Sequence, residues 1–212
     1  MPTQAFIFDL DGVLISSVEM HWYGFRQAFA AEGVEFTREH YLKVGVGAAR
    51  ENVIRTVMGD ITKSKLNVLM TEKERHANEF LETQGLDPIP GSLEFVRRLH
   101  ERKLRTAVAT ASRTPQPFLK AIGATDLFPI VLDRQSTTRP KPEPDIYLLA
   151  AERLQLKPQE CVVVEDSPPG VASARAAGIR VLAVTTTHKR EALTAATATF
   201  SSFDEINVDD WV

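Results

Sequence analysis

Short, continuous apolar runs alternate with amphipathic stretches along most of the chain. Such runs predict buried strands, because the strands of a parallel sheet are covered on both faces. The runs that we interpret as strands are residues 5–8, 105–109, 129–132, 161–164 and 180–184. Between them, apolar residues recur at helical spacing, as in Leu93, Val96 and Leu99. The alternation predicts an α/β fold with a doubly wound, Rossmann-like parallel sheet.

Local signals predict further helices in the same region. Residues 144–154 fit one helix. Ser167 is suited to cap another, with Pro168 in its first turn and Gly178 at its end. His188, Lys189 and Arg190 are interpreted as a solvated helix start.

Residues 15–87 break this rhythm, because they show helical patterning without a strand. The expected helices are residues 20–32, residues 51–58 and one that opens at the capping-box pattern Thr71–Glu74. We therefore predict a catalytic core of residues 1–14 and 88–212 and a small helical cap domain of residues 15–87. Ligands bind at the carboxyl ends of the strands in open α/β sheets, so an insertion after the first strand is placed to act as a lid.

Composition and charge exclude several classes of protein. The chain has 212 residues, a formal net charge of −3 and a single cysteine, Cys161, in a valine-rich run. Bulk charge gives no reason to expect a nucleic-acid partner, and one cysteine cannot form an internal disulfide. No stretch approaches the roughly 20 apolar residues of a membrane span. The residues from Met1 to Gln4 lack the basic region and the long apolar region of a signal peptide, so we expect none. We expect a cytoplasmic protein without a membrane partner, and a monomer, although the sequence does not determine the oligomeric state.

Acidic residues follow two of the predicted strands. Asp9 and Asp11 end the first strand and, being two residues apart, would share a face of an extended chain. Glu165 and Asp166 end the fourth strand. With Thr110 after the second strand and Lys141 in a proline-rich segment, these side chains point to a site for a divalent cation and a phosphoryl group.

Each of these motifs also has a purely structural interpretation. An Asp-x-Asp-Gly turn can serve only backbone hydrogen bonds, and acids or threonines can merely cap helices. Lys141 alone would be a surface lysine. A calcium loop is excluded, because Leu14 and Ile15 stand where further oxygen ligands would be needed. The combination at strand ends, in this order, favours function.

The complete set resembles the haloacid dehalogenase superfamily, in the subgroup of beta-phosphoglucomutase and phosphoglycolate phosphatase with a helical cap. The segments that carry the resemblance are Asp9–Val13, Ala109–Ser112, Lys141–Tyr147 and Glu165–Ser167 with Gly170. The resemblance covers essentially the whole chain.

The resemblance implies a role for each motif residue. Asp9 would be the nucleophile that forms an aspartyl-phosphate, and Asp11 the general acid and then base. Mg²⁺ would be held by Asp9, the backbone carbonyl of Asp11 and Asp166, with Glu165 as a ligand or a supporting group. Lys141 would offset the negative charge of the phosphoryl group, and Thr110 would bind its oxygen atoms. Asp11 also favours phosphoryl transfer over dehalogenation, because halide leaves without a proton.

Candidate residues for substrate choice are expected in the cap and beside Thr110. In the cap they are His21, where sugar-phosphate mutases have a histidine, and Arg50, in the loop 44–50 that loosely resembles a mutase loop. His21 could equally be a packing residue. On the core side they are Ala111, Ser112 and Arg113. Ser16–Ser17 departs from the Asp-Ser or Asp-Thr of close relatives.

The sequence therefore predicts a Mg²⁺-dependent phosphatase of small phosphorylated metabolites. Two alternatives stay open. A phosphomutase would return the phosphoryl group to a sugar, and His21 and Arg50 favour it. A signalling receiver domain also uses clustered acids, a threonine and a lysine around a phosphorylated aspartate, but it would be about half as long and lack the cap.

Overall fold

The chain folds into two compact units, and the computed structural model describes residues 2–46 and 48–212. One unit comprises residues 1–16 and 87–212, and the other comprises residues 17–86. Met1 and Gly47 lie outside the described residues, Gly47 being part of the predicted substrate loop. No helix among the described residues is both long and apolar enough to cross a membrane.

The first unit is built on a six-stranded sheet with all neighbouring strands parallel and with the order β3-β2-β1-β4-β5-β6. Its strands are β1 Ala5–Phe8, β2 Arg105–Ala109, β3 Ile130–Leu132, β4 Cys161–Glu165, β5 Arg180–Val184 and β6 Ala198–Phe200. This is the doubly wound order in which the direction of winding reverses beside β1.

The position of β1 decides where a site can form. β1 lies between β2 and β4, and Phe8 pairs with Val108 on one side and Val164 on the other. The next residue of each strand, Asp9, Ala109 and Glu165, therefore reaches the same edge of the sheet. In open α/β sheets, ligands bind at this point, outside the carboxyl ends of the strands where the order reverses.

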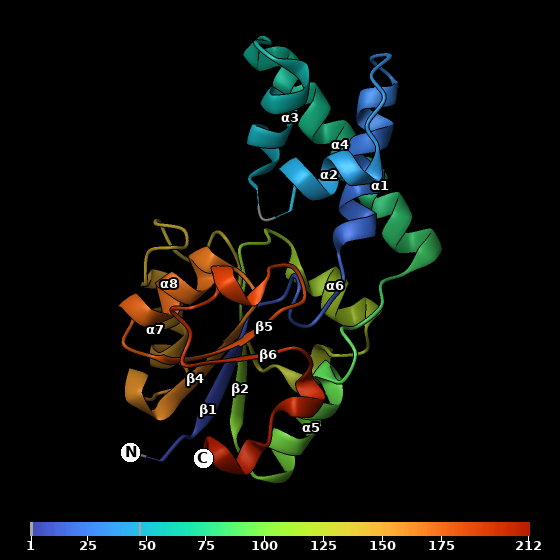
Figure 1. Cartoon of the computed structure of the whole chain (residues 1–212). Helices are drawn as coiled ribbons and strands as arrows, with labels where there is room; N and C mark the ends of the chain where they lie inside the picture. Colours follow the sequence, from blue (N-terminus) through green and yellow to red (C-terminus); the bar gives the residue numbers. More distant parts are fainter. Residues whose placement is uncertain (1, 47) are drawn as a thin grey trace. The chain divides into compact units, whose positions relative to one another are not determined.

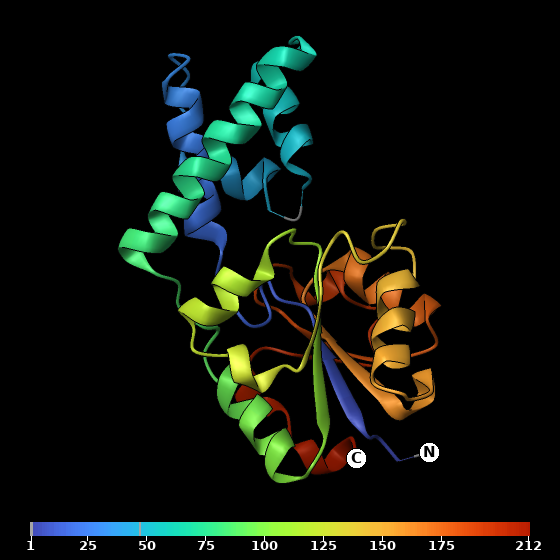
Figure 2. The ribbon, with the colours of Figure 1, turned by 180° about the vertical axis from the view of Figure 1, so that it is seen from behind.

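Helices cover both faces of this sheet, as Figures 1 and 2 show from opposite sides. They are α5 Ser92–Glu101, α6 Pro115–Ala121, α7 Asp145–Arg153 and α8 Pro168–Ala176, with short 3-10 helices at Thr125–Leu127, Pro158–Glu160, Arg190–Ala192, Phe203–Glu205 and Val208–Asp210. The side chains of β1 alternate between the two layers. Ala5 and Ile7 belong to the apolar cluster that includes α7 and α8. Phe6 and Phe8 contact the ring of Phe95 on α5, with ring centroids 5.7 Å and 6.2 Å apart.

The second unit is helical. It contains α1 Val18–Ala30, α2 Arg38–Val44, α3 Arg50–Met58 and α4 Lys63–Gln84 (Figure 1). Its core is rich in aromatic rings: Phe25, Phe29, Phe36 and Tyr41 are buried together. Because this cluster is separate from the two layers around the sheet, the helical unit has a hydrophobic core of its own.

The chain leaves and re-enters the first unit through two adjacent segments, Leu14–Ser16 and Asp87–Ile89, which we call the neck. Ser16 N donates to Asp87 O at 3.1 Å, and Ile89 N donates to Leu14 O at 2.9 Å. Ile15 and Pro88 form an isolated antiparallel bridge. The whole insertion is thus closed by a few hydrogen bonds at its base.

The predicted fold class is confirmed: the sheet is parallel and doubly wound, and a helical segment follows its first strand. Some elements were predicted wrongly or missed. Thr71 does not open a helix, because α4 begins at Lys63 behind the cap Thr62, and the Thr71 hydroxyl donates to Asn67 O within the helix. The helix after Ser167 ends at Ala176 rather than Gly178. Helices α2 and α6 and strand β6 were not predicted.

Candidate functional site

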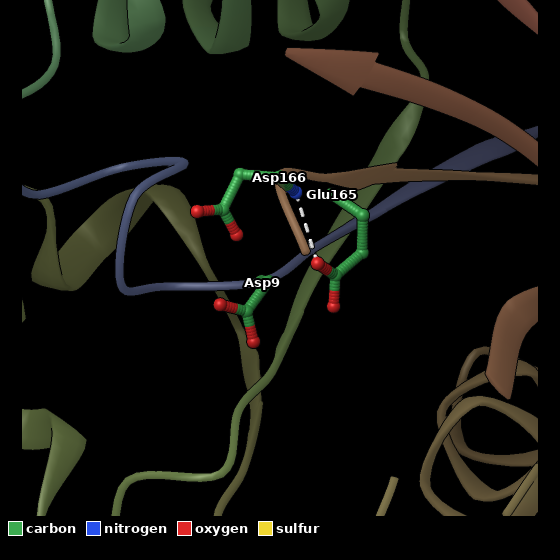
Figure 3. A group of neighbouring side chains, drawn as sticks. All are labelled: Asp9, Glu165 and Asp166. Atoms are coloured by element: carbon green, nitrogen blue, oxygen red, sulfur yellow. Dashed lines mark hydrogen bonds between the residues drawn. The ribbon is translucent and has the colours of Figure 1, made fainter. Parts of the chain in front are cut away.

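Carboxylates from two neighbouring strands converge at the carboxyl edge of the sheet. Asp9 directly follows β1, Glu165 is the last residue of β4 and Asp166 comes next. All are buried, and oxygen atoms of the three carboxylates lie within 4.8 Å of one another. Figure 3 shows the three side chains grouped at this point, with the backbone N–H of Asp166 donating to Glu165. Residues 156 apart in sequence therefore form one acidic cluster.

Lys141 places a positive charge inside this cluster. Its Nζ donates to Asp9 Oδ1 at 2.6 Å, to Glu165 Oε1 at 2.7 Å and to the backbone oxygen of Ala109 at 3.1 Å. An ammonium group has three N–H donors, so all are used. Burial lowers the pKa of Lys141, but the carboxylates of Asp9 and Glu165 outweigh burial and raise it well above its usual value. Lys141 is therefore a fixed cation between two acids.

The segment that carries Lys141 is pinned from outside the cluster. Arg139 makes a bidentate pair with Asp145, with N–O distances of 3.0 Å and 2.9 Å. Ser173 on α8 donates to the backbone oxygen of Glu143 at 2.6 Å. The prolines beside Lys141 restrict the backbone further. These contacts explain how a lysine outside regular structure reaches a defined position.

Both carboxylate oxygens of Glu165 already accept hydrogen bonds, so this side chain supports its neighbours rather than offering a free oxygen to a metal ion. Its Oε1 accepts from Lys141 and from the Tyr147 hydroxyl, and its Oε2 accepts from the backbone N–H groups of Asp166 and Ser167 and from the Ser167 hydroxyl. A carboxylate offers about four lone-pair sites, and here it meets these five donors. The oxygens of Asp9 and Asp166 are therefore better placed to bind a cation. Burial raises the pKa of Glu165, but Lys141 and the other donors outweigh it and lower the pKa overall.

Gly170 leaves room for the side chain of Glu165. A Cβ atom on Gly170 would lie 1.7 Å from Glu165 Oε1 and 1.9 Å from its Cδ. The Glu165 side chain is fully buried and held by its hydrogen bonds, so it has no space into which to retreat. The glycine three residues after Ser167 is thus a requirement of the site.

Burial shifts Asp9 and Asp166 toward their neutral forms. The pKa of Asp9 is raised from 3.8 to about 7, first by burial, against which Lys141 acts, and then by the charges of Glu165 and Asp11. The pKa of Asp166 is raised well above its usual value by burial and by the charges of Glu165 and Asp9. A bound dication would reverse this, because it favours ionised carboxylates.

The donors available here fit a hard cation. They are carboxylate oxygens on a rigid sheet edge, and Mg²⁺ prefers oxygen ligands and keeps several of its waters. A buried cluster of acids with one lysine is short of positive charge, which a dication would supply. Asp9 and Asp166 would hold the ion, with Glu165 supporting Lys141 beside them.

The turn after β1 brings Asp11 near the same acids. Backbone hydrogen bonds from Leu14 N to Leu10 O and from Gly12 N to Ile15 O, each 2.9 Å long, close the segment 10–15 into a compact turn. Gly12 has φ +79°, in the left-handed region that favours glycine. Asp11 itself is half-buried, and its charge contributes to the raised pKa of Asp9.

Thr110 and its neighbours form the side of the site next to β2. Thr110 is buried, its N–H donates to Leu132 O at 2.9 Å, and its Oγ1 accepts from Ser112 N at 3.0 Å. A hydroxyl has one O–H donor besides its two acceptor lone pairs, so Thr110 can donate to a ligand while it accepts from Ser112 N. Ser112 is half-buried, whereas Ala111 and Arg113 are exposed.

The predicted cap residues lie in the helical unit, each with a partner there. His21 Nδ1 is 2.9 Å from Nζ of Lys73, which is buried on α4 although it carries a charge. Arg50 pairs with Glu74 at 2.9 Å. Lys73 was missed in the sequence, because its relation to His21 requires that α1 and α4 pack against each other.

Other side chains next to the acidic cluster were also not predicted. Tyr147, fully buried, donates to Glu165 at 2.8 Å. The Thr187 hydroxyl donates to Asp166 Oδ2. His188, predicted as a solvated helix start, has its Nδ1 only 3.1 Å from the backbone oxygen of Asp166. The sequence signal that could have identified Thr187 is its position among threonines directly after β5, whose carboxyl end lies at the same edge of the sheet.

Comparisons with known proteins agree on one family. The model of the haloacid dehalogenase-like hydrolases matches residues 6–184. Protein CbbY of Rhodobacter capsulatus is 33% identical over 86% of this chain and 85% of its own length. Hexitol phosphatase A of Escherichia coli is 32% identical over 98% of this chain and 95% of its own. The crystal structure of a CbbY variant from Rhodobacter sphaeroides with xylulose-(1,5)bisphosphate superimposes with a TM-score of 0.84, at 25% identity, over 97% of this chain and 96% of that one.

Proposed function

Because the chain belongs to the haloacid dehalogenase-like hydrolases, we propose that it is a Mg²⁺-dependent phosphatase that hydrolyses small phosphorylated metabolites through an aspartyl-phosphate on Asp9. It is a phosphohydrolase of that family; the metal, the intermediate and the substrate class are the proposal. The observation that carries the proposal is Lys141 held between Asp9 and Glu165 at 2.6 Å and 2.7 Å, at the edge of the sheet where its winding reverses. A cytoplasmic location and a monomeric state remain predictions.

Asp9 acts as the nucleophile in this proposal. One of its carboxylate oxygens attacks phosphorus, the bond from phosphorus to the substrate oxygen breaks, and the substrate leaves as an alcohol. Two like unit charges 4 Å apart repel by roughly 4 kcal/mol at an effective dielectric of about 20, so attack on a phosphate dianion needs positive charge nearby. Lys141 supplies one charge. Mg²⁺ on Asp9 and Asp166 would supply charge neutralisation when bound.

Thr110 and Ser112 would hold the transferred group. The Thr110 hydroxyl can donate to a phosphoryl oxygen while its own oxygen accepts from Ser112 N at 3.0 Å. Phosphoryl transfer depends on donors aimed at the equatorial oxygens. Ala111 and Arg113 are the further proposed substrate contacts on this side.

Asp11 would move the protons. It would donate one to the leaving oxygen and later take one from the water that hydrolyses the aspartyl-phosphate. We expect Asp11→Asn to lose turnover while still forming phosphoenzyme from substrates with a good leaving group, since these need no proton. Acid-quench trapping of the acyl-phosphate with p-nitrophenyl phosphate measures it. If no acyl-phosphate accumulates on Asp11→Asn, its proposed role is contradicted.

The proposed substrates are sugar phosphates or phosphoglycolate-like acids. Hexitol phosphatase A, which covers nearly the same length, supports a polyol or sugar phosphate. His21 and Arg50 stay the proposed selecting residues of the helical unit. His21 already contacts Lys73, and Arg50 already pairs with Glu74. A substrate would therefore either displace these partners or bind to them as well.

A phosphomutase is the second candidate, because the buried ammonium group of Lys73, beside His21, gives the helical unit a cation suited to a second phosphate. The receiver alternative is not supported. Receiver domains have the flavodoxin-like strand order 2-1-3-4-5, whereas this sheet has the order 3-2-1-4-5-6.

The experiment that tests the proposal is a panel of phosphorylated sugars, polyols, glycolate and nucleotides. We expect phosphate release with Mg²⁺ and none with EDTA. Isomerisation of a sugar monophosphate without phosphate release would instead establish the mutase. A protein that releases no phosphate from any substrate, and that binds no Mg²⁺ by calorimetry, would contradict the proposal.

A further inference from the structure

Two adjacent threonines after β5, Thr186 and Thr187, form hydrogen bonds with the two loops that carry the acidic residues. The Thr186 hydroxyl donates to the backbone oxygen of Gly12, in the turn after β1. The Thr187 hydroxyl donates to Asp166 Oδ2, after β4. β5 pairs with β4 but not with β1. This segment is therefore a third element that reaches both loops.

The carboxylate of Asp166 is enclosed on two sides by this arrangement. A Cβ atom on Gly12 would lie 2.0 Å from Asp166 Oδ2 and 2.9 Å from Cγ2 of Thr187. Asp166 is only 4% exposed. The backbone of Gly12 and the side chain of Thr187 thus confine the carboxylate, and the hydroxyl fixes its rotation.

The direction of the hydrogen bonds follows from the chemistry of the partners. A carbonyl oxygen can only accept, so the contact of 3.1 Å between His188 Nδ1 and Asp166 O requires the hydrogen on Nδ1. The same N–H lies 2.9 Å from Thr187 Oγ1. With a dication bound, the Asp166 carboxylate is ionised and also only accepts, so the Thr187 proton then points at Asp166 Oδ2. The N–H of His188 therefore orients the Thr187 hydroxyl, and this hydroxyl in turn orients the Asp166 carboxylate.

We propose that Thr187 is a positioning residue for the divalent cation, fixing the Asp166 carboxylate through its hydroxyl while Thr186 holds the adjoining turn. This inference rests on the proposed function, in which Asp9 and Asp166 bind Mg²⁺. Partners behind a metal ligand set its orientation, and their loss commonly weakens metal affinity by about 10- to 100-fold.

The decisive variant is Thr187→Val, which keeps the branched shape and removes the hydroxyl. The segment lines a surface hollow of about 470 Å³, so Thr187→Ala would admit a water that replaces the lost donor only in part and should lose less Mg²⁺ affinity than Thr187→Val. We expect Mg²⁺ affinity, measured by calorimetry without substrate, to fall by about 10- to 100-fold in Thr187→Val. Saturating Mg²⁺ should return kcat to within about threefold of the wild-type value, while the Mg²⁺ concentration for half activity rises.

Two variants separate the hydroxyl from a general loss of structure. Thr187→Ser retains the donor and should bind Mg²⁺ as the wild type does. Thr197→Val removes a hydroxyl at the other end of β5, which accepts from Val181 N at 2.9 Å. It should change thermal stability without changing Mg²⁺ affinity.

Several outcomes would overturn the inference. Wild-type affinity in Thr187→Val would do so, as would equal weakening in Thr187→Ser. If circular dichroism shows that Thr187→Val does not fold, the comparison of Thr187→Ala with Thr187→Ser decides, and equal Mg²⁺ affinities would overturn the inference. If the wild-type protein binds no Mg²⁺, both the proposed function and this inference are contradicted. If the wild type and Thr187→Val bind Mg²⁺ equally well, only this inference is contradicted.

Discussion

Asp9→Asn is expected to abolish phosphate release while leaving the fold intact. A neutral amide is a poor nucleophile, so we expect turnover to fall by a factor on the order of 10⁴ or more. The substitution removes a buried acid whose pKa is already raised to about 7, mainly by burial. Lys141 keeps Glu165 at 2.7 Å and Ala109 O at 3.1 Å. The thermal midpoint without metal should therefore not fall. Phosphate release and circular dichroism measure the two effects.

The matched control is the same substitution after another strand. Asp133 directly follows β3, and its Oδ1 accepts from Gln135 N and from the Ser136 hydroxyl at 2.9 Å. An asparagine oxygen can accept both, so Asp133→Asn should keep wild-type turnover. If Asp9→Asn retains more than about a tenth of wild-type turnover, a loss of less than about 1.4 kcal/mol of transition-state stabilisation, Asp9 is not the nucleophile.

Lys141→Met has the second large expected effect, because it removes the cation between two buried acids. The side chains of Lys141 and Asp9 are 9% and 11% exposed, and that of Glu165 is fully buried. Removing one partner of a buried ion pair typically costs about 3–5 kcal/mol of folding free energy. Turnover should fall by a factor of about 10²–10³, the usual loss for a group that stabilises transition-state charge.

The stability loss should depend on pH in a definite direction. Without Lys141, the pKa values of Asp9 and Glu165 in the folded protein are expected to lie above their unfolded values. The folded state then holds protons that the unfolded state has released, so the free energy of unfolding falls as pH rises through that window. Urea denaturation in EDTA at pH 5.5 and pH 8 measures it, and the deficit should be larger at pH 8.

Lys157→Met is the control for losing a lysine. Lys157 is exposed and precedes the amino end of β4, whereas Lys141 reaches Glu165 at the carboxyl end of that strand. It should show neither the turnover loss nor the pH-dependent deficit. A Lys141→Met protein that is equally destabilised at both pH values would argue that Lys141 acts through packing rather than charge.

The core of the site could be predicted because its residues follow strands. Asp9, Glu165 and Asp166 each end an apolar run, and parallel strands bring such ends to one edge whatever their separation in sequence. Tyr147 could not be given a role in the same way. It lies on α7, and its hydroxyl reaches Glu165 only because α7 packs against the sheet. Helical periodicity marks it simply as a core aromatic.

The errors in the fold have local causes. The Thr71–Glu74 pattern matches a helix start, but the same residues favour a helix interior, where Glu72 pairs with Arg75 at 2.8 Å. The true start at Thr62 lacks an acid three residues later. Strand β6 has three half-buried residues, too few for a period-two pattern to be distinguished from a loop.

The neck has a consequence for how such enzymes diversify. Because Leu14–Ser16 and Asp87–Ile89 are hydrogen-bonded to each other, the ends of the insertion are already joined at its base. The entropy of closing a longer or shorter excursion changes only slowly with its length. If residues of the helical unit select the substrate, as proposed, recombination at this junction exchanges one helical segment for another and alters which metabolite is accepted, while the residues of the acidic cluster stay in place. On that proposal, we expect that replacing residues 17–86 with the matching segment of a relative transfers the relative's substrate preference.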